Sequence, residues 1–136
     1  ETVKQALDAC TSNFMQILAA EFMTGGYLEP YLDLLRQEYH ERKDRLQKAL
    51  AEHMPDEVKW TEPKGGFYYW LRLPKRISSS ELFDNCRERG VVFVSGRTFD
   101  PHNLKDNCLR LSFSNMPKKD IVPGVEILAQ GIRELL

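Results

Sequence analysis

The stretch "EVKWTEPKGGFYYWLRLP", Glu57 to Pro74, decides the fold of this 136-residue chain. Both of its ends are rich in aromatic and β-branched residues, which favour strands. Between them lies Pro63-Lys64-Gly65-Gly66, a sequence typical of a chain reversal. The stretch therefore predicts two neighbouring strands, at residues 58–60 and 67–73, that pair as in a hairpin.

Two helices are predicted before this pair, because apolar residues recur at intervals of three and four. The first helix should run from Val3 to about Met23 and end at Gly25-Gly26. The second should be a single helix of roughly 25 residues that ends before Pro55. Such a helix is long for so small a domain.

The remaining elements follow the strand pair. Ser78-x-x-Glu81 is a capping box, so a helix should run from there to about Arg89. We expect a buried strand at residues 91–94, another at 108–113, and a last helix that begins near Asp120, with Pro123 in its first turn. This order predicts an α+β or α/β fold in which helices cover a small, mainly antiparallel sheet.

The composition argues against several classes of function. The chain has 19 basic and 20 acidic residues, mixed along its length, which gives no electrostatic footprint for nucleic acid. Its apolar runs are too short to span a membrane, so we expect no membrane partner. The basic cluster Arg42-Lys43-Arg45-Lys48 alternates with acids and is interpreted as a solvated helix face.

Cysteine and histidine also point away from disulfide and metal chemistry. Cys10, Cys86 and Cys108 form no CxxC pair and are odd in number, which fits reduced, buried thiols in a cytoplasmic protein. The three histidines are far apart in sequence and lack the short spacing of zinc ligands. We expect no metal site.

Arg110 is the main candidate for chemistry. It lies in the middle of a predicted strand, on the face opposite Leu109 and Leu111, and its planar guanidinium suits bidentate binding of a carboxylate. Residue types alone still favour an arginine on a solvated sheet face.

Gly65 and Gly66 would let a ligand approach the backbone closely, although an ordinary turn is the simpler interpretation. The aromatic run 67–70 favours packing over a stacking platform, and the arginine of Ser95-Gly96-Arg97 favours a surface charge.

Several segments resemble, in the same order, the C-terminal third of class I/II aminotransferases, which are fold-type I enzymes dependent on pyridoxal phosphate. "YLEPYLDLLRQEYHERKDRLQKAL", Tyr27 to Leu50, is similar to the long helix that links the large and small domains of that family. Glu57 to Pro74 resembles the opening strands of the small domain. "RGVVFVSG", Arg89 to Gly96, and "NCLRLSFSN", Asn107 to Asn115, resemble its later strands. The likeness is greatest to the 2-aminoadipate and aromatic aminotransferase branch, which includes the effector domains of MocR-type regulators.

The resemblance implies a function and a set of substrate-binding residues. Arg110 would clamp the α-carboxylate of an amino acid or 2-oxo acid, and Gly65 and Gly66 would approach the active-site cleft. Residues 1–25 would be the terminal helix of the large domain, and residues 26–136 the small domain with its linking helix. Pyridoxal 5'-phosphate would be the cofactor, and the parent protein a cytoplasmic homodimer.

The resemblance also implies what this chain lacks. The Ser-x-x-Lys lysine that holds the cofactor in this family has no counterpart here, so we expect the chain alone to be catalytically inert, with no catalytic or cofactor-binding residue of its own. Its N-terminal helix, separated from the missing large domain, would expose an apolar stripe and drive self-association.

Two departures from the family pattern and two alternatives remain. Ser95 stands where the family usually has a proline, which predicts a looser turn, and Pro123 is unusual inside the last helix. The chain could instead belong to the effector-sensing domain of a MocR/GntR-type transcription regulator. It could also be a stand-alone interaction module, which would be a stable monomer.

Overall fold

The structure of the chain is a computed structural model that describes residues 2–7, 11–102 and 106–136. The chain forms two compact units, residues 1–38 and 39–136. None of the helices within the described ranges combines the length and apolarity that crossing a bilayer requires. The predicted boundary near residue 25, between a large-domain helix and the small domain, stays a prediction.

The first unit contains α1 (Thr2–Leu7), α2 (Asn13–Thr24) and the start of α3 (Leu28–His53). The prediction of one helix over residues 3–23 was wrong. Ser12 has the non-helical angles φ −50° and ψ 120° at the start of α2, and the Thr11 carbonyl accepts a hydrogen bond from Gln16 Nε2 at 3.0 Å. Serine and threonine favour such helix starts over helix interiors. Residues 8–10, and with them the predicted thiol of Cys10, lie outside the described residues.

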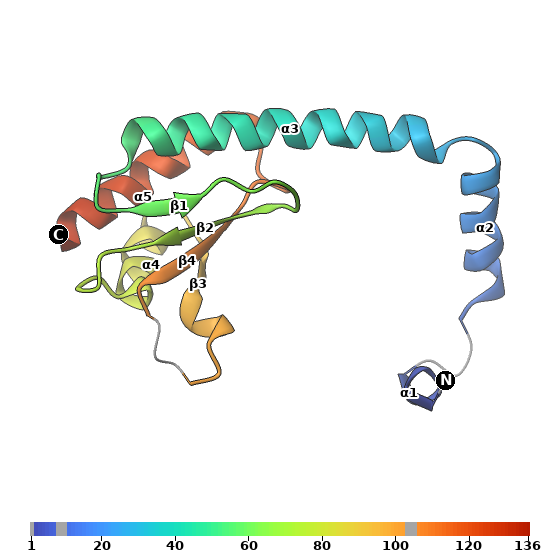
Figure 1. Cartoon of the computed structure of the whole chain (residues 1–136), viewed down its shortest axis with the longest axis horizontal. Coiled ribbons are helices and arrows are strands. Elements are labelled where there is room, and N and C mark those ends of the chain that lie inside the picture. The colour runs from blue at the N-terminus through green and yellow to red at the C-terminus, as the bar shows by residue number, and fades with distance from the viewer. Residues whose placement is uncertain (1, 8–10, 103–105) are drawn as a thin grey trace. The chain divides into compact units, whose positions relative to one another are not determined.

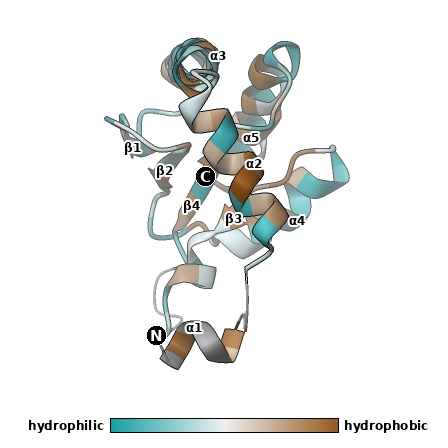
Figure 2. Cartoon of the chain, turned by 90° about the vertical axis from the view of Figure 1, so that its right-hand side faces the viewer, coloured by the Kyte–Doolittle hydropathy of each residue, from teal (hydrophilic) through white to brown (hydrophobic). Residues whose placement is uncertain are grey.

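No residue of α2 is buried, although hydrophobic residues colour parts of its ribbon brown in Figure 2. Phe14, for example, is 69% exposed. The apolar stripe predicted from the sequence is therefore exposed in the described part of this unit.

The second unit contains an antiparallel sheet of β1 (Lys59–Thr61), β2 (Tyr68–Arg72), β3 (Val94–Ser95) and β4 (Cys108–Ser112), in the order β1-β2-β4-β3 (Figure 1). The predicted strand pair is confirmed as β1 and β2. The strand predicted at residues 91–94 was largely wrong, because only Val94 and Ser95 pair with β4, and Val92 is 62% exposed.

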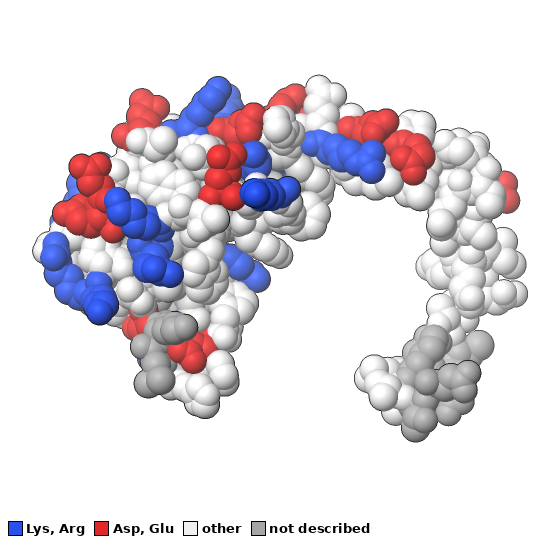
Figure 3. All heavy atoms as spheres, viewed as in Figure 1, with Lys and Arg blue, Asp and Glu red and all other residues white. Residues whose placement is uncertain are grey.

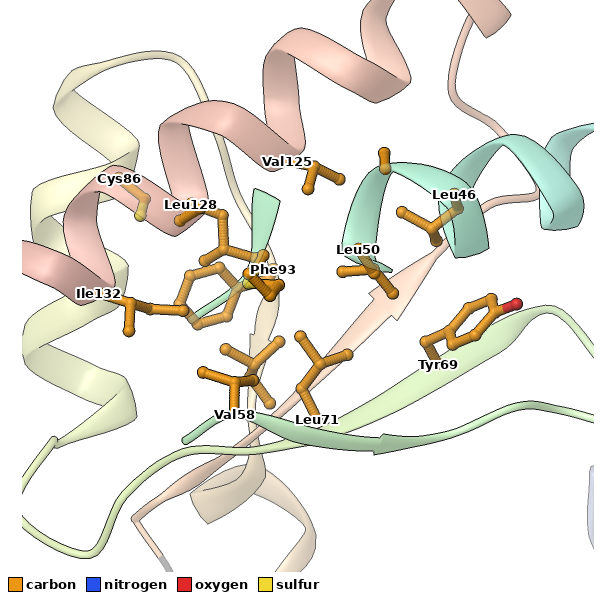
Figure 4. Packing of buried hydrophobic residues seen from close by; sticks show 14 of the residues in the cluster. Leu46, Leu50, Val58, Tyr69, Leu71, Cys86, Phe93, Val125, Leu128 and Ile132 are labelled. Carbon is orange, nitrogen blue, oxygen red and sulfur yellow. The ribbon is translucent and has the colours of Figure 1, made fainter. Parts of the chain in front are cut away.

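Helices cover one face of this sheet, which confirms the predicted fold class. The C-terminal half of α3, α4 (Ser79–Glu88) and α5 (Ile121–Leu135) all supply side chains to one core (Figure 4). The most deeply buried apolar side chains include Leu50, Tyr69, Leu71, Leu82, Leu109, Leu128 and Ile132. As predicted, the Ser78 hydroxyl caps α4 by accepting a hydrogen bond from Glu81 N at 3.2 Å, and Pro123 lies in the first turn of α5.

Arg45 and Lys48 of α3 are exposed, as expected for a solvated helix face, but three of the four basic residues also make contacts beyond the helix. Arg42 Nη1 donates to the Ser114 carbonyl at 2.6 Å, and Arg45 Nη1 donates to the Lys118 carbonyl at 2.8 Å. Lys43 Nζ lies 2.9 Å from Glu62 Oε1, and this hydrogen bond raises the pKa of Lys43. The charges therefore tie α3 to loops of the sheet. On the face shown in Figure 3, acidic and basic side chains interleave.

Candidate functional site

Arg110 lies on the sheet face that the helices leave uncovered. Side chains alternate along a strand, so the fully buried Leu109 faces the core and Arg110 faces away from it. Trp70 is the register partner of Arg110 on β2, and Tyr68, paired with Ser112, is its diagonal neighbour. The predicted orientation of Arg110 is thereby confirmed.

Two aromatic rings contact the Arg110 guanidinium. Its Cζ atom lies 4.1 Å from the centre of the Tyr68 ring and 4.7 Å from that of Phe99, which ends the 3₁₀ helix η1 (Gly96–Phe99). Phe99 also contacts Trp70 edge to face, at 5.6 Å between ring centres. Tyr68 and Trp70 are each partly exposed, as predicted for residues on a sheet face. The contact of Tyr68 with Arg110 was not predicted from the sequence.

Within the ranges that the structure describes, the Arg110 side chain forms no ion pair with a carboxylate. Other arginines of the same unit do: Arg89 Nη2 lies 2.5 Å from Glu134 Oε2. Buried or half-buried guanidinium groups are normally paired, because removing their charge from water is costly. The half-buried Arg110 guanidinium thus lacks the carboxylate partner, among the described residues, that such groups normally have.

Packing of η1 against β4 positions Phe99. A Cβ atom at Gly96 would lie only 2.7 Å from Cys108 Cβ, so glycine is required for this close approach. Cys86 and Cys108 are both buried and unbridged, as predicted. Phe99 can reach Arg110 because the glycine lets η1 sit directly on the strand.

Ser95 holds the turn that leads into η1. Its angles, φ −60° and ψ 140°, are those that proline also adopts. Its hydroxyl oxygen accepts a hydrogen bond from Arg97 N at 3.3 Å and lies 2.6 Å from Ser79 Oγ. The turn expected to be looser without proline is thus held by two side-chain hydrogen bonds that proline cannot make.

Asp106 joins the start of α4 to the segment that precedes β4. Its carboxylate accepts hydrogen bonds from the hydroxyls of Ser78, Ser79 and Ser80, at 2.5, 2.9 and 3.0 Å. Burial raises the pKa of Asp106, but the three hydroxyls and the charge of Arg97 outweigh it, so the net pKa lies below the ordinary value. The run of three serines at positions 78–80 is the sequence signal for this cluster, although the sequence predicted only the helix cap at Ser78.

Gly65 and Gly66 lie in the turn before β2. Apart from the adjacent residues of the chain, no described residue lies within 4 Å of a Cβ at either position, and Gly66 has φ +78°. Close approach of these glycines to a substrate stays a prediction.

A mainly apolar hollow of about 350 Å³ lies between the β3–β4 edge, α3 and α5, and Arg110 is one of its lining residues. Apolar side chains such as Leu46, Phe93 and Val125 form most of its wall. Among the described residues that line it there is no lysine.

The family model for class I and II aminotransferases matches residues 3–128. The chain belongs to this family. It is 38% identical over 134 residues to aromatic-amino-acid aminotransferase 1 of Thermococcus litoralis, covering 98% of this chain and 32% of that protein. It is 35% identical over 133 residues to 2-aminoadipate transaminase of Thermus thermophilus, covering 98% of this chain and 33% of that protein.

A solved relative shows the same fold. The structure of Pyrococcus horikoshii kynurenine aminotransferase, in complex with PMP, matches with a TM-score of 0.93 and 38% identity, over 99% of this chain and 33% of that one. The chain thus spans about a third of the length of these relatives. Uncharacterised HTH-type transcriptional regulators of Bacillus subtilis also match 98% of the chain.

Proposed function

We propose that Arg110 binds the α-carboxylate of an amino acid or a 2-oxo acid in a reaction that transfers the amino group between them. The reaction would take place in the whole protein, meaning this chain with any further sequence to which it is joined. The observation that carries the proposal is a half-buried guanidinium, held by two aromatic rings, with no acidic partner in the described part of the chain.

The geometry suits this role. Tyr68 and Phe99 contact the guanidinium without offering a carboxylate oxygen to its N–H groups. Two of these N–H groups can therefore bind one carboxylate in parallel. A carboxylate held by two parallel N–H groups has a fixed orientation, and so does the Cα–H bond beside it. Arg110 would thereby present that bond for proton removal in one orientation, which reduces the entropic part of the barrier.

Pyridoxal phosphate is the cofactor that we infer for the whole protein, in line with the family and with the PMP complex of the Pyrococcus relative. When bound, it would act as the electron sink for the substrate Cα. The groups that contact the Arg110 guanidinium do not themselves fit it, because the rings of Tyr68 and Phe99 offer no amine to bond the cofactor aldehyde. We therefore assign this chain carboxylate binding and no step on the cofactor.

The test is Arg110→Leu in the whole protein. Loss of a bidentate, charge-assisted contact should cost about 2–5 kcal/mol of transition-state binding. This corresponds to roughly one and a half to three and a half decades in kcat/KM for transamination. Wild-type kcat/KM in the variant would show that Arg110 does not bind the carboxylate.

Arg87→Leu is the matched control. Arg87 is also an arginine near an aromatic ring, Phe83 at 6.0 Å, but it lies on α4 and pairs with Asp84 at 3.8 Å. We expect its kcat/KM to stay within about twofold of wild type, because exposed ion pairs contribute little.

A second candidate is effector sensing by a transcription regulator, which the Bacillus relatives favour. Arg110 would then bind the carboxylate of an effector without turnover. Incubation of the whole protein with pyridoxal phosphate, an amino acid and a 2-oxo acid distinguishes the two. Appearance of the new amino acid supports the enzyme, and binding without product supports the regulator.

The proposal extends to assembly and location. We infer a homodimer in the cytoplasm, and the exposed apolar side chains of α2 support burial of this helix against further protein. Sedimentation velocity of the whole protein tests the dimer, and a monomer at micromolar concentration would contradict it.

A further inference from the structure

We propose that Tyr68 and Phe99 are positioning residues that hold the Arg110 guanidinium ready for a carboxylate. The inference rests on the proposed role of Arg110. It adds a role for two residues that the sequence offered no reason to connect with the site, since they lie 31 positions apart, on β2 and η1.

The first step of the argument is that two rings from separate elements, β2 and η1, contact the same guanidinium. Their centres lie 4.1 and 4.7 Å from Arg110 Cζ. Each ring has a further aromatic neighbour, Phe67 for Tyr68 and Trp70 for Phe99, but among the described residues the two rings do not contact each other. The Arg110 guanidinium is therefore the group that both rings contact.

The second step is that the rings restrict the guanidinium without using its N–H groups. Arginine has many rotamers, and fixing such a side chain on binding costs conformational entropy. Two rings that contact the guanidinium before the ligand binds reduce the conformational freedom that is left to lose on binding. An acid at the same place would also hold it, but the acid would compete with the incoming carboxylate for the same N–H groups.

The third step is that each ring is itself held. Phe99 contacts Trp70 edge to face, and η1 lies on β4 through the close approach of Gly96 to Cys108. Tyr68 contacts Phe67 edge to face at 6.5 Å. The Tyr68 hydroxyl makes no hydrogen bond among the described residues, so the ring itself, rather than its hydroxyl, makes the contact that matters.

The experiment measures the Kd of 3-phenylpropionate for the whole protein by isothermal titration calorimetry. This probe has a carboxylate but no amino group, so it cannot react. Arg110→Met should weaken it strongly. Tyr68→Leu and Phe99→Leu should each weaken it roughly three- to tenfold, the range expected from loss of one cation–π contact. Tyr68→Phe keeps the ring and should keep the wild-type Kd.

A double-mutant cycle identifies a positioning role. If Tyr68 acts through Arg110, Tyr68→Leu should have no further effect on the Kd in the Arg110→Met background. Binding of 3-phenylpropanamide, which lacks the charge, should not change in Tyr68→Leu. In steady-state kinetics, both leucine variants should raise KM alike for every amino acid accepted, since the α-carboxylate is common to all.

Phe83→Leu is the control for a general loss of packing. Phe83 contacts Phe93 and an arginine of its own helix, but not Arg110. This variant should leave the Kd of 3-phenylpropionate unchanged.

Three results would overturn the inference. If Tyr68→Leu raised the Kd of 3-phenylpropionate by the same factor in the wild-type and the Arg110→Met backgrounds, the ring would contact the ligand directly. Unchanged binding in both leucine variants, together with strong weakening in Arg110→Met, would reject the positioning role and leave the proposed function standing. Unchanged binding in Arg110→Met would reject the proposed function itself.

Discussion

Gly96→Ala should destabilise the second unit and displace η1. The added Cβ would lie 2.7 Å from Cys108 Cβ and 2.8 Å from the Cys108 carbonyl oxygen. Carbon atoms in contact prefer about 3.5–4.0 Å, so the new methyl group is roughly 1 Å too close. Two of the three nearest atoms are backbone atoms of the central strand β4 and cannot rotate away. We therefore expect a loss of about 1–3 kcal/mol in unfolding free energy, the usual cost of overpacking.

Urea unfolding of the chain, followed by tryptophan fluorescence, measures this loss. The chain has two tryptophans, Trp60 and Trp70, and both belong to the second unit, so the signal reports on that unit alone. Gly65→Ala is the matched control, because a Cβ there meets nothing within 4 Å. Adding Cys108→Ala to Gly96→Ala should give no rescue, since alanine keeps the offending Cβ. An unchanged urea midpoint in Gly96→Ala would refute the tight contact between η1 and β4.

Two further predictions concern the serine cluster and the glycine turn. The pKa of Asp106 is lowered from 3.8 in the folded state, so its stabilising effect is complete well above that pH and is lost as the pH falls through the folded pKa. Asp106→Asn should therefore lower the unfolding free energy at pH 7 by about 1–3 kcal/mol. The difference in unfolding free energy between wild type and variant, measured by urea titration, should be smaller at pH 3. An equal difference at both pH values would contradict this prediction. Gly66→Ala places a side chain at φ +78° and should lower the unfolding free energy by about 1 kcal/mol. Gly65→Ala should leave the unfolding free energy unchanged. If the turn approaches the substrate, Gly65→Ala should nevertheless lower the kcat/KM of the whole protein.

The sequence predicted those elements whose boundaries depend on nearby residues. The long helix ends before Pro55, α4 begins at its serine cap, and α5 begins where Pro123 falls in the first turn. These signals act over a few residues, so they can be recognised without knowledge of the fold. The face of Arg110 could also be predicted, because alternation along a strand is a local rule.

The failures have a different cause. The run Val91 to Val94 is as apolar as a buried strand, yet only its last residue pairs, because pairing depends on where β4 lies. The basic residues of α3 look solvated on a helix surface, but Arg42 reaches a carbonyl 72 positions away. Likewise, no local pattern indicates that Phe99 contacts Arg110. Contacts of this kind arise only from the folded arrangement.

A comparison of Arg89 with Arg110 shows why an acidic residue paired with Arg110 would hinder the binding of a ligand carboxylate. Arg89 is paired with Glu134 at 2.5 Å, and that interaction raises the pKa of Arg89 and lowers that of Glu134. A ligand carboxylate would have to displace Glu134 to bind there, and the exchange of one carboxylate for another gains little. At Arg110, Tyr68 and Phe99 attract the positive charge but offer no competing carboxylate. An incoming carboxylate there would form a new ion pair without breaking an existing one, which is what a binding site for an anion requires.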